Sequence, residues 1–373
     1  MRNIPNVTYL LGAGASANAL PVINELPSRL KIFKKLLEDR CVDEHQSLFL
    51  LELFNPEIKS IARELISDIE WALQELLSHS TIDTLAKRLY LISSRHNDLE
   101  RLKRLLYIYF LFEQGYNDTN IRESTIKEAP DKRYDSFIAT YISPKIDKLE
   151  MPGNIKIVTW NYDIQMELAF SKYLAVTDLD RVQERLQIFP NSLRSIDSFD
   201  EKSFGIVHLN GIINGVLGWN FSDDFRVDFY GLDQSKKGYL EIICQIYKKL
   251  EKEHLRYLTY SWEDPQEFSI TFKEKNNLKG IASKIFANTD ILVVVGYSFP
   301  IFNRSVDKEL MRNLKKEIQH IYIQDTKDNV EDIKNIFINS FSDSIGLVKG
   351  RLPNIISTVN YTNQFHIPAE MNL

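Results

Sequence analysis

The stretch Val7–Ser16 reads VTYLLGAGAS and decides the fold. Its first five residues are apolar or favour extended structure, which is typical of a strand buried on both faces of a parallel sheet. The next five residues, Gly12–Ser16, are all small and predict a tight turn. A buried strand that runs through a glycine turn into a helix is the usual opening of a dinucleotide-binding unit.

The rest of the chain repeats this pattern of short apolar runs separated by helical segments. Further strands are predicted at Ile155–Thr159, Gly205–Leu209, Ile291–Val295 and Ile321–Ile323. Helices are predicted between or after them at Ile164–Leu174, Tyr239–Glu253, Asn276–Ala287, Val306–Ile318 and Asn329–Phe341. This alternation predicts an α/β fold with a Rossmann-like, mostly parallel sheet and helices on both faces.

One long segment departs from this alternation. Between residues 27 and 150, apolar residues recur every three or four positions, and Gly115 is the only glycine. We therefore expect residues 27–150 to form a helical insertion in an α/β domain made of residues 1–26 and 151–352. Residues 353–373 are expected to form a C-terminal tail or an edge strand. The helices expected in the insertion are Arg29–Asp39, Ile58–Ser78, Thr84–Ser94, Asp98–Phe112 and Tyr134–Leu149.

The composition excludes several classes of protein. The 373 residues include 46 Lys and Arg against 51 Asp and Glu, and the net charge of −5 argues against a general nucleic-acid coat protein. Two cysteines, Cys41 and Cys244, are too few for a four-cysteine zinc site or a secreted disulfide framework. There is neither an 18-residue apolar run nor a signal-peptide pattern at Met1–Pro5. We expect a cytoplasmic protein with no metal, no membrane contact and no direct nucleic-acid binding.

The glycine turn at Gly12–Ser16 is the first candidate binding site. Glycine lets the backbone approach a pyrophosphate closely, and the start of the following helix offers free N–H donors. Ala17 occupies the position of the third glycine in the usual dinucleotide fingerprint. A tight strand-to-helix turn without a ligand is therefore an equally acceptable interpretation of this motif.

A second candidate site follows the strand Ile155–Thr159. Asn161 and Asp163 lie two residues apart beyond the carboxyl end of that strand, where open parallel sheets bind their ligands. An amide and a carboxylate in this position can hold sugar hydroxyls or orient a water molecule. The alternative is that one of them only caps the helix Ile164–Leu174.

Three other strand ends carry candidate residues. His208, two residues before Asn210, is a candidate general base, although a single histidine is more often a hydrogen-bonded structural residue. Gly296 and Ser298 can contact phosphate or ribose, or they only connect a strand to a helix. Asp325 can accept hydrogen bonds from an adenosine ribose or cap the next helix.

The order of these motifs resembles that of the sirtuin-like family. GAGAS comes first, followed by a Thr-x-Asn-x-Asp strand end, a strand with a histidine before a glycine, and a GYS strand end. More closely, the order resembles the bacterial branch without zinc, whose members hydrolyse NAD in antiphage defence. The resemblance covers residues 7–25, 155–168, 205–215 and 290–325. It leaves the helical block and the C-terminal tail uncovered.

The resemblance implies a role for each matching residue. Asn161 is expected beside the nicotinamide ribose, where it helps to orient the attacking group, and Asp163 is expected to bind nicotinamide or to shape its pocket. NAD is then the substrate, and no zinc is needed. The residues expected to bind NAD are Gly12, Ala13, Gly14 and Ser16 at the pyrophosphate, Gly296, Tyr297 and Ser298 at phosphate and ribose, Thr159, Asn210 and Gly211, and, more loosely, Asp325.

One position departs from the family pattern. The catalytic histidine of the family directly precedes the glycine, and in this chain Asn210 occupies that place. We assign the base to His208, because only an imidazole accepts a proton near neutral pH, with Asn210 as the alternative position. Because of this departure, a second interpretation is a module that binds NAD or ADP-ribose without turnover. A protein deacylase or an ADP-ribosyltransferase is the third interpretation.

The resemblance also bears on regulation. It implies an NAD glycohydrolase that releases nicotinamide and ADP-ribose, and such an enzyme would kill its host if it were not restrained. The chain has no P-loop motif and no evident sensor domain. The resemblance therefore implies a homo-oligomer and a separate activating protein, either a HerA-type ring ATPase or, as the second choice, an Argonaute-type protein.

Overall fold

The described chain forms two compact units, of which unit 1 contains the main sheet and unit 2 is helical. Unit 1 comprises residues 1–17, 130–212 and 259–373, and unit 2 comprises residues 18–129 and 213–258. The computed structural model describes residues 4–22, 25–42, 56–115, 130–145, 148–175, 179–190, 196–213, 237–251, 258–263, 271–345 and 352–371.

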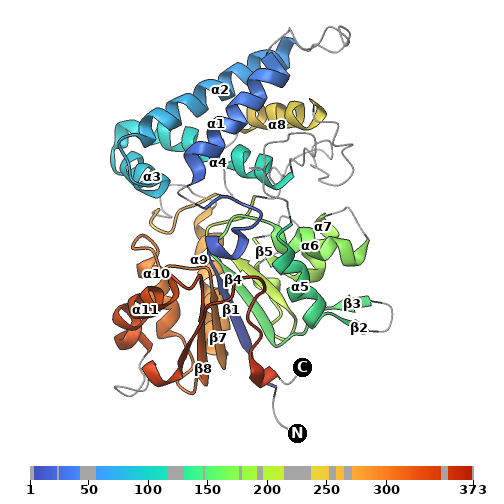
Figure 1. Ribbon diagram of the computed structural model, residues 1–373, viewed down its shortest axis with the longest axis vertical. Helices are drawn as coiled ribbons and strands as arrows, with labels where there is room; N and C mark the ends of the chain where they lie inside the picture. The colour runs from blue at the N-terminus through green and yellow to red at the C-terminus, as the bar shows by residue number, and fades with distance from the viewer. Residues whose placement is uncertain are drawn as a thin grey trace. The chain divides into compact units, whose positions relative to one another are not determined.

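Unit 1 is built on a seven-stranded sheet in which every pairing is parallel. The order of the strands across it is β5-β6-β4-β1-β7-β8-β9 (Figure 1). The predicted Rossmann-like parallel sheet is therefore confirmed. The strands are β1 (Val7–Leu11), β4 (Ile155–Thr159), β5 (Ile188–Phe189), β6 (Gly205–His208), β7 (Ile291–Val295), β8 (His320–Gln324) and β9 (Ile356–Val359).

The central strand is β1, which pairs with β4 on one side and with β7 on the other. The chain first builds β4, β5 and β6 on one side of β1 and then crosses to build β7, β8 and β9 on the other. The carboxyl ends of β1 and β7 therefore flank the point at which the winding direction reverses. Ligands of open α/β sheets bind at such a point.

Helices cover both faces of the sheet. On one face α9, α10 and α11 pack against inward-facing residues that include Leu10, Val158 and Val294. On the other face Tyr9 contacts Tyr141 of α5, and α6 and α7 continue the same layer. Figure 1 shows the α10–α11 pair and the α5–α7 group on opposite sides of the strands. The helices are α5 (Lys132–Tyr141), α6 (Gln165–Leu174), α7 (Leu179–Leu186), α9 (Thr271–Ala287), α10 (Arg304–Arg312) and α11 (Val330–Ile345).

Two predicted helices of unit 1 end earlier in the structure than predicted. The helix predicted at Tyr134–Leu149 ends at Tyr141, and a hairpin of β2 (Ser143–Lys145) and β3 (Lys148–Glu150) follows it. Pro144 is the physical reason, because proline has no backbone N–H and disfavours helical geometry in the residue before it. The other helix, α10, ends at Arg312 rather than at Ile318. The sequence pattern predicted neither α7 nor the two-residue strand β5.

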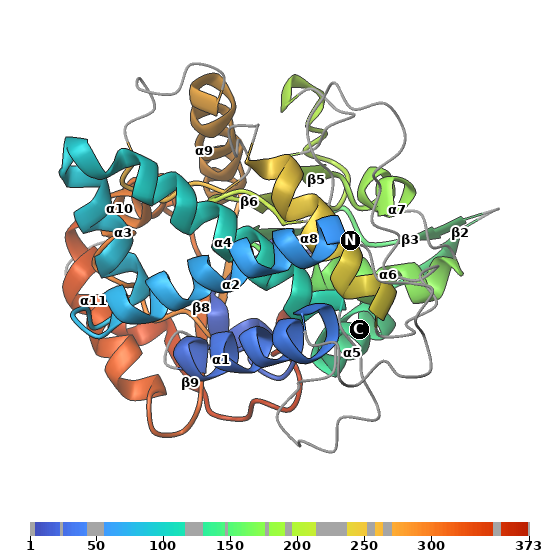
Figure 2. The same cartoon turned by 90° about the horizontal axis from the view of Figure 1, so that it is seen from above.

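Unit 2 is a bundle of α-helices in which α8 packs against α2 and α4. Figure 2 shows α1, α2, α4 and α8 alongside one another. A buried ion pair between Arg29 and Glu113 links α1 to α4, and Asp68 of α2 accepts a hydrogen bond from the Tyr247 hydroxyl of α8 at 2.6 Å. The helices are α1 (Leu26–Leu37), α2 (Pro56–Leu76), α3 (Ile82–Leu91), α4 (His96–Gly115) and α8 (Lys237–Leu250), with the short π-helix η3 (Glu38–Val42) after α1.

The division into units differs from the expected domain boundaries. Residues 130–150, expected in the helical insertion, belong to unit 1, while residues 18–26 and 213–258, expected in the α/β domain, belong to unit 2. The apolar face of α8 packs on α2 and α4, and an amphipathic pattern does not specify which partner covers it. Residues 252–253, at the end of the helix predicted there, lie outside the described residues. In residues 353–373, Ile356–Val359 form the edge strand β9.

Cys41 of η3 and Cys244 of α8 are buried thiols of unit 2 that form no disulfide. A hydrogen bond with Cys41, together with burial, raises the pKa of Cys244. Within the described ranges, no group of three or more His, Cys, Asp or Glu side chains is placed to hold a metal ion. None of the helices described is long and apolar enough to cross a membrane.

Candidate functional site

The turns that follow β1 and β7 pack against each other through their backbones. Gly12 N–H donates to the carbonyl oxygen of Val295 at 3.0 Å, and Gly14 N–H donates to that of Gly296 at 2.9 Å. A Cβ on Gly12 would lie 2.6 Å from the Tyr297 ring, and one on Gly14 would lie 2.7 Å from the Gly296 backbone. This packing accounts for both glycines of the GAGAS turn without a ligand, as the tight-turn interpretation requires.

Asn161 joins the ends of β1 and β4. Its backbone N–H donates to the Thr159 hydroxyl at 3.0 Å, which closes the turn after β4. Its side-chain Nδ2 donates to the Gly12 carbonyl oxygen at 2.9 Å and to Ser16 Oγ at 3.3 Å. The sequence predicted Thr159, Asn161 and Ser16 as parts of one site, and the structure brings them together.

Asp163 belongs to the same network and lies at the start of α6. Its Oδ1 accepts a hydrogen bond from Gln165 N–H at 3.2 Å, so it satisfies a donor in the first turn of the helix. Burial raises the pKa of Asp163 to about 6, even though hydrogen bonds from Ser16 and Asn161 act in the opposite direction. A carboxyl group whose pKa is this close to neutrality is suited to proton transfer.

Two residues of the network, Asp131 and Arg133, were not among the predicted site residues. Arg133 Nη2 donates to the carbonyl oxygens of Gly14 at 3.1 Å and Ala15 at 3.0 Å. It also pairs with Asp131 at 2.6 Å, and the two residues are only 6% and 1% exposed. Tyr134, the next residue, places its hydroxyl 2.9 Å from Ser16 Oγ. No local pattern signals the contacts of Arg133 and Tyr134 with the β1 turn, because they join residues more than 110 positions apart.

His208 lies at the end of β6, opposite Thr159 of β4, and only 2% of it is exposed. Its Nδ1 donates to the carbonyl oxygen of Asn161 at 3.0 Å. Its Nε2 faces Glu167 of α6, with 3.9 Å to Oε1, and has no hydrogen-bond partner among the described residues. Burial lowers the pKa of His208 to about 4, so the ring is neutral at neutral pH.

Asn210 and Gly211 form the turn after His208. The Asn210 carbonyl oxygen accepts hydrogen bonds from the Thr259 N–H at 2.9 Å and hydroxyl at 3.2 Å. Its side-chain Oδ1 is buried and has no partner within the part of the chain that the structure describes. A buried polar atom without a partner costs about 1–3 kcal/mol, so this atom is a natural contact for a bound polar group. Gly211 has a φ of 97°, which glycine adopts without strain.

The loop after β7 places its three predicted residues in different surroundings. Tyr297 points into the core, where its hydroxyl donates to Asp307 Oδ2 at 2.8 Å. Trp160 Nε1 donates to the other oxygen of the same carboxyl group at 3.2 Å. A ligand contact from Tyr297 would therefore come from its backbone. Ser298 is exposed and Gly296 is half-buried.

The Asp307 carboxyl group predicts a pH dependence of stability. Burial raises the pKa of Asp307 to about 8, although its two hydrogen-bond donors and the nearby Arg304 act in the opposite direction. At pH values between about 4 and 8, the folded chain therefore keeps a proton on this carboxyl group that the unfolded chain has lost. The free energy of unfolding should therefore fall as the pH rises from about 4 to 8, by at most about 1.4 kcal/mol per pH unit from this group. Asp307→Asn should remove that slope.

Urea denaturation between these pH values measures the Asp307 effect. Asp328→Asn, at an exposed aspartate of the same unit, is the control and should leave the slope as it is. Asp163 and Glu167 also have raised pKa values, but their contribution to the slope is the same in wild type and in both variants. Parallel curves for wild type and Asp307→Asn would contradict the prediction.

Asp325 lies beyond β8 and contacts the segment that leads into α11. Its Oδ1 accepts hydrogen bonds from Thr326 N–H at 2.8 Å and from Asn329 Nδ2 at 3.3 Å. Both contacts are to residues before α11, which begins at Val330, so within the described residues neither the ribose interpretation nor the capping alternative is tested by them. Gln324, the preceding residue, was missed by the sequence reasoning: its Nε2 donates at 2.7 Å to the carbonyl oxygens of Tyr361 and Gln364 and so anchors the C-terminal segment.

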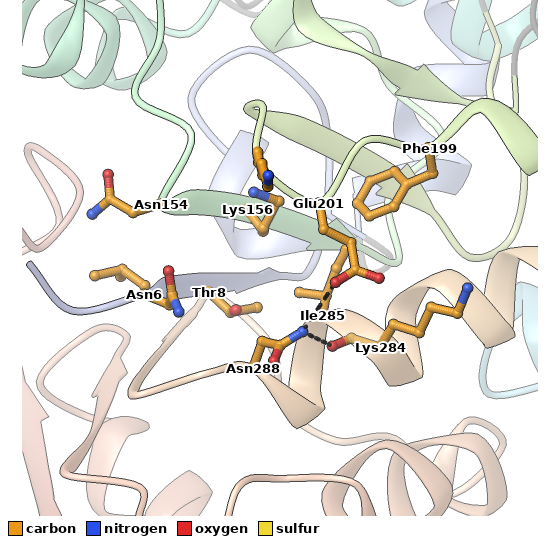
Figure 3. A pocket seen from close by; sticks show the side chains of 11 residues that line it. Asn6, Thr8, Asn154, Lys156, Phe199, Glu201, Lys284, Ile285 and Asn288 are labelled. Carbon is orange, nitrogen blue, oxygen red and sulfur yellow. Dashed lines mark hydrogen bonds between the residues drawn. The ribbon is translucent and has the colours of Figure 1, made fainter.

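Two cavities of unit 1 lie at the amino ends of the strands and contain none of these network residues. The smaller, about 210 Å³, is lined by Lys156, Glu201 and Asn288 among others (Figure 3). Burial lowers the pKa of Lys156 to about 8, and its Nζ donates to the Gly153 carbonyl oxygen. The larger cavity is about 520 Å³. Parallel sheets bind their ligands at the opposite, carboxyl edge, so the network is the better candidate site.

The comparisons with known proteins assign no family and no function to this chain. No protein-family model matches the chain, and no curated protein matches it significantly. The case for a function therefore depends on the residues themselves. Of the predicted site residues, Gly12, Ser16, Thr159, Asn161, Asp163 and His208 belong to one hydrogen-bonded network, whereas the side chains of Tyr297 and Asp325 make their hydrogen bonds elsewhere.

Proposed function

We propose that the protein is an NAD glycohydrolase that cleaves NAD to nicotinamide and ADP-ribose. The observation that carries the proposal is the position of Asn161, whose amide bridges the β1 turn while Asp163 lies two residues away. Both residues follow β4, beside the point at which the sheet reverses its winding direction. The resemblance to zinc-less sirtuin-like hydrolases supports the same substrate.

The proposed reaction replaces a C–N bond by a C–O bond. The bond between nicotinamide and ribose breaks, its electron pair leaves with nicotinamide, and the ribose carbon takes on oxocarbenium character. Water then adds to that carbon and loses a proton to a base. Preorganised amide and carboxyl groups stabilise the positive charge and orient the water, which is how Asn161 and Asp163 would act. A base role for His208 requires its Nε2 to reach a hydroxyl group or water, and Asp163 is the second candidate.

The test is the release of nicotinamide from NAD by the purified chain at several protein concentrations. Asn161→Ala should lower the turnover rate by about 100-fold or more, because a positioned hydrogen-bond group is lost. Asn288→Ala is the matched control: it removes the same side chain at the opposite edge of the sheet and should leave turnover unchanged. Folding of both variants is compared by thermal unfolding. Turnover at the wild-type rate in Asn161→Ala would refute the proposal.

A binding module without turnover is the second candidate function. Two observations favour it: Asn210 stands where the family has its histidine, and His208 Nε2 faces Glu167. If the wild-type chain releases no nicotinamide, a titration with NAD and ADP-ribose tests this candidate. Binding that Asn161→Ala weakens would support it.

The proposed cellular role is an antiphage effector that depletes NAD. Such an effector has to be held inactive, so we propose that activity depends on self-assembly and on a partner protein, with a HerA-type ring ATPase preferred to an Argonaute-type protein. Addition of that partner to the nicotinamide assay, followed by mass photometry, tests both requirements.

A further inference from the structure

Two buried ionisable side chains, Glu167 of α6 and His208 of β6, face each other beside Asn161. Glu167 Oε1 lies 3.9 Å from His208 Nε2, and the two residues are 1% and 2% exposed. Within the described residues, neither carboxyl oxygen of Glu167 has a hydrogen-bond partner, and neither does His208 Nε2. Buried polar groups in folded proteins almost always find partners, so these two are expected to pair directly or through one water molecule.

The proton positions of the two groups are complementary. A carbonyl oxygen only accepts hydrogen bonds, so the 3.0 Å contact to Asn161 places the proton on His208 Nδ1 and leaves Nε2 as an acceptor. Burial lowers the pKa of His208 to about 4 and raises that of Glu167 to about 8. At neutral pH a protonated carboxyl group therefore faces a neutral imidazole. Asp163, the other ionisable group acting on Glu167, raises its pKa further.

We propose that Glu167 and His208 form a positioning pair that fixes the main chain of Asn161. Glu167 holds the His208 ring through Nε2, and the ring holds the Asn161 carbonyl oxygen through Nδ1. The side-chain amide of Asn161 is then aligned with Gly12 and Ser16. Only the effect on turnover rests on the proposed function, because the hydrogen bonds themselves need no substrate.

The pair is tested first without any assay of activity. Nitrogen NMR on full-length protein labelled with ¹⁵N-histidine reports the protonation of each ring nitrogen, and His208→Gln identifies the His208 signals. In wild type, Nδ1 should stay protonated and Nε2 should stay an acceptor between about pH 5 and pH 8. A His208 ring that titrates near its ordinary pKa would overturn the proposal, and this readout requires only folded wild-type protein.

Three variants then separate the pair from a general packing effect. Glu167→Leu removes the donor and should shift the Nε2 signal, whereas Glu167→Gln still has an N–H donor and should stay close to wild type. Glu184→Gln, at an exposed position of α7, is the control and should change nothing. An Nε2 signal that is the same in Glu167→Leu as in wild type would overturn the proposal.

Nicotinamide release distinguishes positioning from direct proton transfer. Glu167→Leu should lower kcat by about 10- to 100-fold with little change in KM for NAD, and Glu167→Gln should retain most of the activity. The pH profile of kcat should keep its shape in Glu167→Leu. Loss of one limb of that profile would make Glu167 a group that takes part in proton transfer and would overturn the positioning role. If wild type releases no nicotinamide, the proposed function fails, while the NMR result still decides the pair.

Discussion

Gly296→Ala is expected to unfold unit 1 under conditions in which the wild-type chain is stable. Gly296 has a φ of 59°, a conformation that costs a residue with a Cβ about 1–2 kcal/mol. The added Cβ would also lie 2.4 Å from Ala15 N and from the Gly14 carbonyl carbon. Both are backbone atoms of the neighbouring turn, so no side chain can move aside to accommodate it.

Relief of this clash requires the two turns to separate. Separation breaks the hydrogen bond from Gly14 N–H to the Gly296 carbonyl oxygen, which contributes about 1 kcal/mol, and overpacking adds about 1–3 kcal/mol. The expected loss of about 3–6 kcal/mol is comparable with the whole stability of an ordinary domain. Urea denaturation measures the loss, and hydrogen exchange of peptides from β1 and β7 locates it in unit 1.

Gly280→Ala is the matched control for this substitution. Gly280 lies in α9, and a Cβ added there meets no atom within 4 Å. Because alanine favours helix by about 1 kcal/mol over glycine, this variant should be as stable as wild type or slightly more stable. If Gly296→Ala matched Gly280→Ala in stability, the close packing of the two turns would be wrong.

Arg133→Ala is expected to cost about 3–5 kcal/mol in the free energy of unfolding. The substitution leaves the carboxylate of Asp131 buried without its cation, and it removes the donor to the Gly14 and Ala15 carbonyl oxygens. Since those carbonyl groups belong to the β1 turn, the NAD turnover of the surviving folded protein should fall as well. Urea denaturation and nicotinamide release are the two measurements.

A second variant separates the lost ion pair from lost packing. Arg133→Met combined with Asp131→Leu replaces both charges by apolar groups and should recover part of the stability, because no buried charge is left unpaired. Arg312→Ala, at an exposed position of α10, should change stability by no more than about 0.5 kcal/mol. A loss below about 1 kcal/mol in Arg133→Ala would show that the buried pair does not hold the turn.

The sheet and the strand ends that carry polar residues could be predicted from the amino-acid pattern. Buried parallel strands are short continuous apolar runs, and Val7–Leu11, Ile155–Thr159 and Ile291–Val295 were predicted with the bounds that the structure has. The carboxyl ends of parallel strands meet at one edge of a sheet, so the pattern also predicts that Gly12, Asn161 and His208 lie at the same edge.

The atoms that these residues contact became known only from the folded structure. It showed that Gly12 and Gly296 bring two turns together and that the Tyr297 hydroxyl lies in the core. It also showed that Arg133 donates to the β1 turn and that Glu167 faces His208. It also placed α8 with the helices of unit 2. The physical reason is that spacing along the chain specifies which face of an element is apolar, whereas the partner of that face depends on packing between segments more than 100 residues apart.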